Sequence, residues 1–190
     1  QVPGATGLAN YSPFPVAGVT LDPRQGAIVG GARHFCGLRV GGAVVCWGNN
    51  FYGQIGIGTA GTGNATDPNE RSLPVLVPGV TLRYLRLVRD TSCGLNATGD
   101  LVCWGASFVG QRADGTPVTK QTTPLTILQG NLKFVQLAGR DVTVCGLTPG
   151  NETYCWGSNR FNDFGTGSLS PATSIDPVKI DDLGPFQSLP

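Results

Sequence analysis

The chain has 190 residues, with 29 glycines, 14 prolines and no methionine, and its 13% of charged residues leave a formal net charge of +1. So small and balanced a charge argues against a nucleic-acid-binding surface and a polybasic membrane patch. No stretch approaches the roughly 20 apolar residues of a membrane-spanning helix, so no direct membrane insertion is expected. Glycine and proline are spread along the whole chain, which favours a turn-rich all-β protein.

One pattern occurs three times along the chain. The stretches CGLRVGGAVVCWGNNFYGQIGIG, CGLNATGDLVCWGASFVGQRADG and CGLTPGNETYCWGSNRFNDFGTG begin at Cys36, Cys93 and Cys145. Each is preceded by a proline-led apolar segment, a loop and a second apolar segment. The pattern predicts the end of a preceding blade at 1–20, repeats at 21–78, 79–130 and 131–182, and the start of a further blade at 183–190.

The third repeat shows most clearly what each repeat builds. Apolar or alternating runs bounded by Gly, Pro and Asn predict strands at Phe134–Ala138, Val142–Leu147, Glu152–Gly157 and Pro177–Ile180. Four strands in about 50 residues are typical of one blade of a β-propeller. Three blades are fewer than a propeller needs to close, so we expect the missing blades to come from a longer chain or from an oligomer.

Six cysteines form three pairs, each with the same spacing across a turn that contains glycine. Residues equidistant from a hairpin turn face each other within disulfide range. We therefore predict the disulfides Cys36–Cys46, Cys93–Cys103 and Cys145–Cys155. Buried free thiols are the alternative. A metal site is not expected, because there is no Cys-x-x-Cys and the chain has 1 histidine.

Disulfides indicate an oxidising compartment, so we expect an extracellular or cell-surface location through the secretory pathway. Four Asn-x-Ser/Thr sequons point the same way. Asn96 and Asn151 fall in the predicted hairpin turns, and Asn64 lies in the longest polar loop. Asn10 is followed by Tyr-Ser-Pro and is a poorer acceptor. The sequence predicts N-glycans at Asn64, Asn96 and Asn151.

A Trp-Gly pair follows the second cysteine of every repeat. These residues are Trp47, Gly48, Trp104, Gly105, Trp156 and Gly157. We expect the tryptophans to pack between strands and blades, and an exposed aromatic platform for carbohydrate is the alternative. In the segment that follows, Gly53 and Gly110 align with Asn162, and both residue types tolerate positive φ, which predicts a tight irregular loop. No lysine or helix signal follows these glycines, so a nucleotide-binding loop has little support.

The pattern Ala/Gly-Gly-x-x-x-x-Cys-Gly-Leu … Cys-Trp-Gly-x-Asn-x-x-Gly-Gln-x-Gly-x-Gly resembles the regulator of chromosome condensation repeat, above all in VVCWGNNFYGQIGIG. The resemblance implies blades of a seven-bladed propeller. The cysteine-paired form is similar to Crinkly-type receptor kinase ectodomains and related secreted proteins. The resemblance to the repeat also places His34, Thr91 and Thr143 at equivalent positions of the three repeats. We expect these three residues to form internal hydrogen bonds.

These observations predict a non-enzymatic, extracellular protein-interaction or structural scaffold of a secreted or cell-surface glycoprotein. Its protein or glycan partner would contact the loops between strands, especially Asn50–Ser72. A ligand-binding Crinkly-type ectodomain and a secreted inhibitor-like propeller are the alternatives. No cofactor and no nucleic acid are expected. An enzyme is disfavoured, because there is no Gly-x-Ser-x-Gly motif and the acidic residues are scattered over turns. These acids are Asp90, Asp100, Asp114, Asp141 and Asp163.

Overall fold

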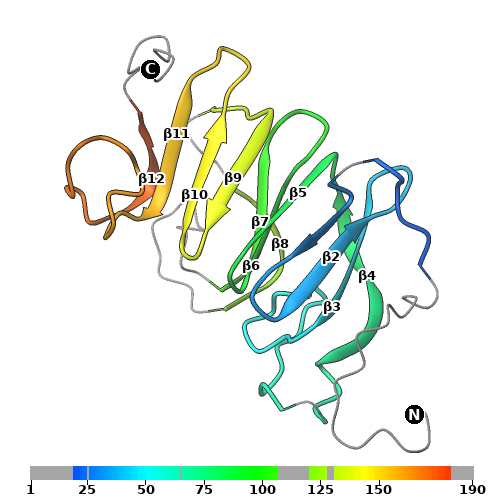
Figure 1. The fold of residues 1–190 in the computed structure, drawn as a ribbon. Helices are drawn as coiled ribbons and strands as arrows, with labels where there is room; N and C mark the ends of the chain where they lie inside the picture. Colours follow the sequence, from blue (N-terminus) through cyan, green and yellow to red (C-terminus); the bar gives the residue numbers. More distant parts are fainter. Residues whose placement is uncertain (1–18, 25, 65, 107–119, 128–130, 181–190) are drawn as a thin grey trace, which may run out of the picture.

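The computed structural model describes residues 19–24, 26–64, 66–106, 120–127 and 131–180, and these residues form three four-stranded antiparallel sheets without a helix (Figure 1). Each sheet corresponds to one repeat, and the strands pair in chain order within each sheet. The prediction of an all-β chain of four-stranded blades is confirmed. Closure into seven blades stays a prediction. No helix long and apolar enough to cross a membrane occurs in the described part of the chain.

The three blades have the same construction. Blade 1 consists of β1 (Ile28–Gly30), β2 (His34–Leu38), β3 (Ala43–Gly48) and β4 (Arg71–Thr81). Blade 2 consists of β5 (Tyr84–Val88), β6 (Thr91–Leu95), β7 (Leu101–Ala106) and β8 (Lys120–Ile127). Blade 3 consists of β9 (Gln136–Arg140), β10 (Thr143–Leu147), β11 (Thr153–Ser158) and β12 (Thr173–Lys179). The first strand of blade 2, β5, contacts the first strands of both neighbouring blades, β1 and β9.

The four strands predicted in the third repeat are present, but their ends are shifted. Phe134 precedes β9, because its N–H donates to the carbonyl of Gly99 in blade 2 at 2.9 Å and its ring is fully buried. The last strand begins at Thr173, ahead of the predicted Pro177, because residues before the proline pair with β11 across a bulge. Strand β4 likewise continues past residue 78, the expected end of the first repeat.

Each blade has two faces of different composition, which decide how the blades stack. The cysteine face carries the disulfide, and the tryptophan face carries the Trp of the Trp-Gly pair, because neighbouring residues of a strand point to opposite sides. The cysteine face of blade 1 packs on the tryptophan face of blade 2, and blades 2 and 3 repeat this arrangement. The two interfaces between blades also bury aliphatic side chains such as Leu85 and Leu137. Full burial of one such side chain stabilises the fold by about 1.5–3 kcal/mol.

The two rims of the array also differ (Figure 1). The hairpin rim consists of the turns at 39–42, 96–100 and 148–152, together with the connections between blades. The loop rim consists of the long loops at 49–70 and 159–172 and the short turns that precede β2, β6 and β10. Antiparallel pairing places these two sets of connections at opposite ends of the strands.

Candidate functional site

The structure forms the three disulfides that the cysteine spacing predicts. Each joins residues directly opposite each other on the two middle strands of one blade. The Cα–Cα distances are 4.1 Å for Cys36–Cys46 and Cys93–Cys103 and 4.0 Å for Cys145–Cys155. The described residues contain no free cysteine. The two middle strands of every blade are therefore joined covalently.

Two of the sequon asparagines lie together on the hairpin rim, while Asn64 lies exposed on the loop rim. Asn151 is exposed in the turn after β10 with a φ of 63°. Asn96 organises the turn after β6, where its Oδ1 accepts the backbone N–H groups of Thr98 and Asp100 at 3.0 and 2.9 Å. Glycosylation itself stays a prediction, and Asn10 lies outside the described residues.

The three tryptophans have unequal surroundings. Trp104 and Trp156 are 0% and 1% exposed in the two interfaces between blades. Trp47 is only half-buried and stacks on Phe35, with ring centroids 5.7 Å apart and planes at 15°. The glycine after each tryptophan adopts positive φ, and a Cβ at Gly105 would collide with the carbonyl of Asp90 in the turn before β6.

Gln54, in the loop after β3, connects blade 1 to blade 2, and sequence reasoning missed this role. Its backbone carbonyl accepts the Trp104 Nε1–H at 2.9 Å and the Ser92 hydroxyl at 2.9 Å. Its side-chain amide donates to Asn49 Oδ1 at 2.9 Å and to Asp90 Oδ1 at 3.3 Å. We call this set of contacts the latch. The Gly-Gln-x-Gly segment of the repeat was the available signal.

His34, Thr91 and Thr143 all form internal hydrogen bonds. The hydroxyls of Thr91 and Thr143 each donate at 2.6 Å to the backbone carbonyl of the last residue of the following strand, Ala106 in β7 and Ser158 in β11. The His34 Nε2 lies 2.8 Å from the Ser92 hydroxyl of blade 2. That hydroxyl donates its proton to the Gln54 carbonyl, so it accepts from Nε2–H, and the His34 Nδ1 is unprotonated.

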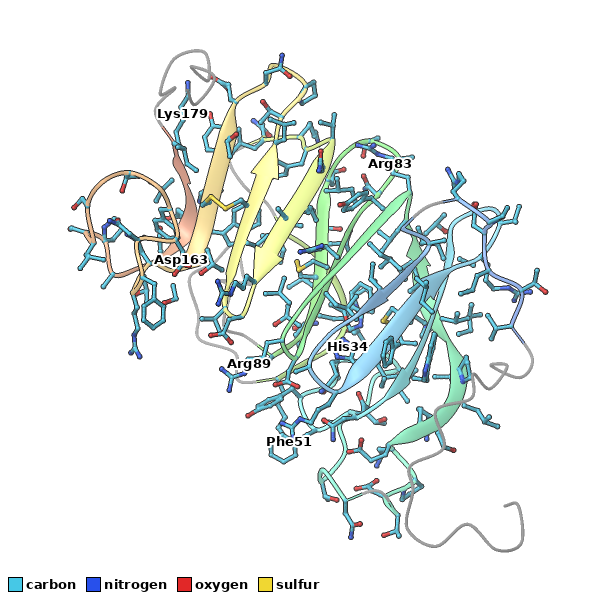
Figure 2. The ribbon with its side chains drawn as sticks, viewed as in Figure 1. His34, Phe51, Arg83, Arg89, Asp163 and Lys179 are labelled. Carbon is cyan, nitrogen blue, oxygen red and sulfur yellow. A yellow bond between two sulfur atoms is a disulfide. The ribbon has the colours of Figure 1, made fainter. Side chains whose placement is uncertain are left out.

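Burial lowers the pKa of His34 to about 3, so its imidazole is neutral at physiological pH. Its Nδ1 atom is buried without a hydrogen-bond partner. Figure 2 shows His34 at the loop-rim end of blade 1, where it meets blade 2. The residue therefore stabilises the interface only in its neutral form, and its surroundings give it no role as a proton donor to solvent.

Two buried asparagines shape the long loops of the loop rim. The Asn50 side chain donates to the Thr59 carbonyl at 2.9 Å and accepts the Ile55 N–H at 3.0 Å. Asn159 accepts the Phe164 N–H at 3.0 Å in the equivalent loop of blade 3. Both asparagines are 0% exposed. The loops are thus built into the blades, and the asparagine of the Trp-Gly-x-Asn segment was the signal for this function.

Loop 49–70 presents an aromatic pair on the loop rim. Phe51 and Tyr52 are partly exposed and meet edge to face, with centroids 4.8 Å apart. The ammonium of Lys120 lies 4.0 Å from the centre of the Phe51 ring, a cation–π contact. Figure 2 shows Phe51 projecting at this rim, opposite Arg83 and Lys179. An exposed aromatic group beside a cation is typical of a protein-contact surface.

A cavity of about 680 Å³ lies on the loop rim, where the turn before β10 and the loop after β11 meet Arg89 of blade 2. Its lining includes Arg89, Arg140, Asp141, Arg160, Phe161 and Asp163. Arg89 Nη1 lies 3.4 Å from Asp141 Oδ1, and Phe161 is 85% exposed. Two acids that the sequence interpretation treated as scattered, Asp141 and Asp163, therefore line the same cavity.

The other acids lie apart from this cavity. Asp90 is buried beside Arg33 and Arg89 in the turn before β6, at N–O distances of 3.9 and 3.8 Å. Asp100 lies on the hairpin rim, where hydrogen bonding to Lys133 lowers the pKa of its carboxyl to about 2. Asp114 lies outside the described residues. Within the described ranges, no group of three or more His, Cys, Asp or Glu side chains could hold a metal ion.

Three four-stranded antiparallel sheets, each with a disulfide between its two middle strands, place this chain in the class of propeller-type blade proteins. Residues 27–54 match the family model described as "Regulator of chromosome condensation (RCC1) repeat". The chain therefore carries an RCC1 repeat there, and the resemblance seen in the sequence is confirmed. The three sheets match blades of the RCC1 propeller.

Particular proteins extend this similarity over most of the chain. Human HERC4, a probable E3 ubiquitin-protein ligase, is 30% identical over 162 residues, which is 83% of this chain and 14% of that protein. The structure of human WBSCR16 matches with a TM-score of 0.67 and 22% identity, over 84% of this chain and 39% of that chain. Yeast RCC1 (Prp20), bound to Kap60, matches with a TM-score of 0.65 and 23% identity, over 81% and 37%.

The chain spans only 14–15% of the length of the HERC4 proteins that it matches in sequence. Identities of 22–23% to the solved structures show the fold alone.

Proposed function

We propose that this chain is a non-enzymatic protein-interaction module of a secreted or cell-surface glycoprotein. The separation of the two rims is the observation that carries the proposal. Asn96 and Asn151 share the hairpin rim, where attached glycans would cover the surface. The loop 49–70, with its partly exposed aromatic pair, lies on the opposite rim, away from these two asparagines, where a partner can bind.

Three disulfides support an extracellular location. Each closes a short loop between two strands that are already paired, which contributes about 2–3 kcal/mol only where the bond stays oxidised. A cytosolic protein would keep these thiols reduced, and the repeated stabilisation would be lost. The sequons point to the same compartment independently of the cysteines.

The composition of the rim supports a protein partner. Phe51 and Tyr52 offer apolar contact area, and Lys120 adds a single positive charge beside them. Aromatic groups surrounded by polar residues are the usual centre of a protein–protein contact. The yeast RCC1 protein Prp20 is itself bound to a protein, Kap60, in its solved structure. We do not extend the ligase activity of HERC4 to this chain, because the chain covers only 14% of that protein.

The test is binding of the labelled, secreted chain to the surface and matrix of cells of the source organism, with crosslinking and mass spectrometry to identify the contact. The variant Phe51→Ser with Lys120→Glu removes the aromatic group and reverses the charge. We expect its dissociation constant to rise by about tenfold or more.

The matched control is Val40→Ser with Arg39→Glu on the hairpin rim, which makes the same two kinds of change. Val40 is 72% exposed, so the control costs little stability. It should bind like the unaltered chain. If the control loses binding and the loop-rim variant retains it, the contact surface is on the other rim and the proposed orientation is wrong.

A further inference from the structure

A second cavity, of about 410 Å³, lies where the first strands of all three blades end at the loop rim. Its lining includes Gly30 and Gly31 of blade 1, the end of β5 with the turn after it in blade 2, and the end of β9 in blade 3. The cavity therefore spans both junctions between the described blades, rather than lying on the outer face of blade 1 or blade 3. We call it the arginine cleft, after its charged lining residues Arg86, Arg89, Arg140 and Asp141.

The arginine cleft holds a local excess of positive charge. Three arginines and one aspartate line it, whereas the whole chain has a formal net charge of only +1. Asp90 is buried nearby but does not remove this excess, because it lies 3.9 Å from Arg33 as well as 3.8 Å from Arg89. Positive charge gathered in one hollow of a nearly neutral chain favours an anionic ligand.

The three arginines are neutralised to different extents. Arg89 Nη1 lies 3.4 Å from Asp141 Oδ1. Arg86 is half-buried and reaches blade 3, where its Nη2 donates to the Gly139 carbonyl at 2.8 Å, while its Nε is buried without a hydrogen-bond partner. Among the described residues, no carboxylate pairs with Arg86 or Arg140. Removing a guanidinium from water without a counter-ion is costly, and a bound anion would offset that cost.

We propose that the arginine cleft binds carboxylate side chains of an acidic segment of the partner. Planar guanidinium groups bind carboxylates through pairs of N–H donors. The cleft adjoins the surface assigned to the partner, because Gln54 of loop 49–70 donates at 3.3 Å to Asp90, the residue after Arg89. Figure 2 shows Arg89 and Phe51 at the same rim. This inference rests on the proposed function, since it names the chemistry of the partner that this rim binds.

The composition of the cleft favours a peptide carboxylate over a phosphate or a densely sulfated glycan. The carboxylate of Asp141 lines the cleft and pairs with Arg89. A doubly charged phosphate or a polysulfated chain would be repelled by Asp141 more strongly than a singly charged carboxylate. Phe51 and Tyr52 on the same rim offer apolar contact to the other side chains of a peptide. A cavity of this volume accepts single side chains.

Fluorescence anisotropy with a labelled peptide of alternating Glu and Ala, at about 50 mM salt where screening is weak, tests the cleft. Arg140→Gln removes an exposed charge from the lining, so we expect the dissociation constant to rise by about fivefold or more. The matched control is Arg39→Gln, the same change at an exposed arginine of the hairpin rim, which should bind normally. A peptide of the same length with Gln in place of Glu should not bind.

Two results of this experiment overturn the assignment. Equal affinities for the Glu and Gln peptides would show that the carboxylates are not recognised. Equal effects of Arg140→Gln and Arg39→Gln, whether both weaken binding or neither does, would show that the peptide is not held in the cleft.

Asp141→Asn gives a readout of opposite sign. The substitution removes the acidic residue from the lining, and asparagine tolerates the positive φ of 50° at this position. The dissociation constant of the Glu peptide should fall by about threefold or more, a gain that loss of structure cannot imitate. An unchanged or weaker affinity contradicts an anion site in this cleft.

Competition with a sulfated oligosaccharide separates the two sources of anionic groups. If it displaces the Glu peptide at lower concentration than the unlabelled peptide does, and Arg140→Gln abolishes this, the cleft takes sulfate groups and the carboxylate assignment is wrong. Failure here is distinguishable from failure of the proposed function. A chain that ignores the Glu peptide but loses cell-surface binding through Phe51→Ser with Lys120→Glu has the proposed contact surface and a different ligand chemistry. The reverse pair of results supports the cleft and contradicts the proposed contact surface.

Discussion

Trp104 and Trp47 occupy the same position in neighbouring blades and differ in almost everything around them. Trp104 is fully buried under the cysteine face of blade 1, and its Nε1–H donates to the Gln54 carbonyl at 2.9 Å. Trp47 stacks on Phe35, on a face that the described residues cover only in part. The repeat motif therefore supplies only one of the two surfaces of each interface between blades. The stabilisation depends on whether a second blade supplies the other half.

The largest contrast is expected from replacing these two tryptophans. Trp104→Ala removes a fully buried indole and its hydrogen bond, so the free energy of unfolding should fall by about 3–5 kcal/mol. Trp47→Ala should lower it by less, about 1–2 kcal/mol, because Trp47 is already partly exposed in the folded chain. Urea denaturation of both variants at sub-micromolar protein measures both values. Equal losses would show that blade 1 is covered in solution.

The disulfides offer a second, smaller contrast. Replacing Cys93 and Cys103 by alanine opens a short loop and leaves small voids in a fully buried interface, so the loss should be about 3 kcal/mol. The same change at Cys145 and Cys155 should cost less, about 2 kcal/mol, because the surrounding face is partly exposed and can relax. Guanidinium denaturation of both double variants gives the difference. A larger loss at Cys145–Cys155 would mean that this face is the better packed of the two.

Acid should weaken the interface between blades 1 and 2 through His34. Its folded pKa is lowered to about 3 from an unfolded value of 6.5, so the unfolded chain takes up a proton that the folded chain refuses. The stability is fully present above pH 6.5 and falls by about 2 kcal/mol between pH 8 and pH 5. The chain has 1 histidine, so His34→Gln should flatten the profile in this window. An equally steep profile in the variant would place the titrating group elsewhere.

The smallest effect is expected at the hairpin rim. Lys133 hydrogen-bonds to the Asp100 carboxylate and is the main cause of its lowered pKa. Lys133→Ala should therefore raise the pKa of Asp100 towards 3.8 while costing at most about 1 kcal/mol, because the pair is partly exposed. Carboxyl chemical shifts followed from pH 5 to pH 2 report the change. An unmoved pKa would indicate that the bonds from Thr98 and Asn96 suffice.

The local features of this fold could be predicted from the sequence, because their causes are local. The spacing of Cys93 and Cys103 across a turn determines which residues face each other in a hairpin, and the same holds for Asn96 in the turn itself. The shift of the last strand to Thr173 was missed, because Pro177 is the strongest local signal while the pairing partner lies in β11.

The site could be predicted only in part, because its decisive contacts join residues that are distant in the chain. Gln54 contacts Ser92 and Trp104 in another repeat, and the Gly-Gln-x-Gly segment that signals a special role for Gln54 does not reveal these two partners. The different burial of Trp47 and Trp104 was equally hidden, since both follow the same Cys-Trp-Gly pattern. The exposure of each tryptophan depends on whether a neighbouring blade covers it, and the sequence of a single repeat does not encode this.

Peptide mapping of native, non-reduced material is the most direct test of the central claim that these blades form a module of an extracellular glycoprotein. The expected result is the three links Cys36–Cys46, Cys93–Cys103 and Cys145–Cys155 in the same preparation that carries glycans at Asn96 and Asn151. Free thiols at all six cysteines, together with unmodified asparagines at both hairpin turns, would contradict it.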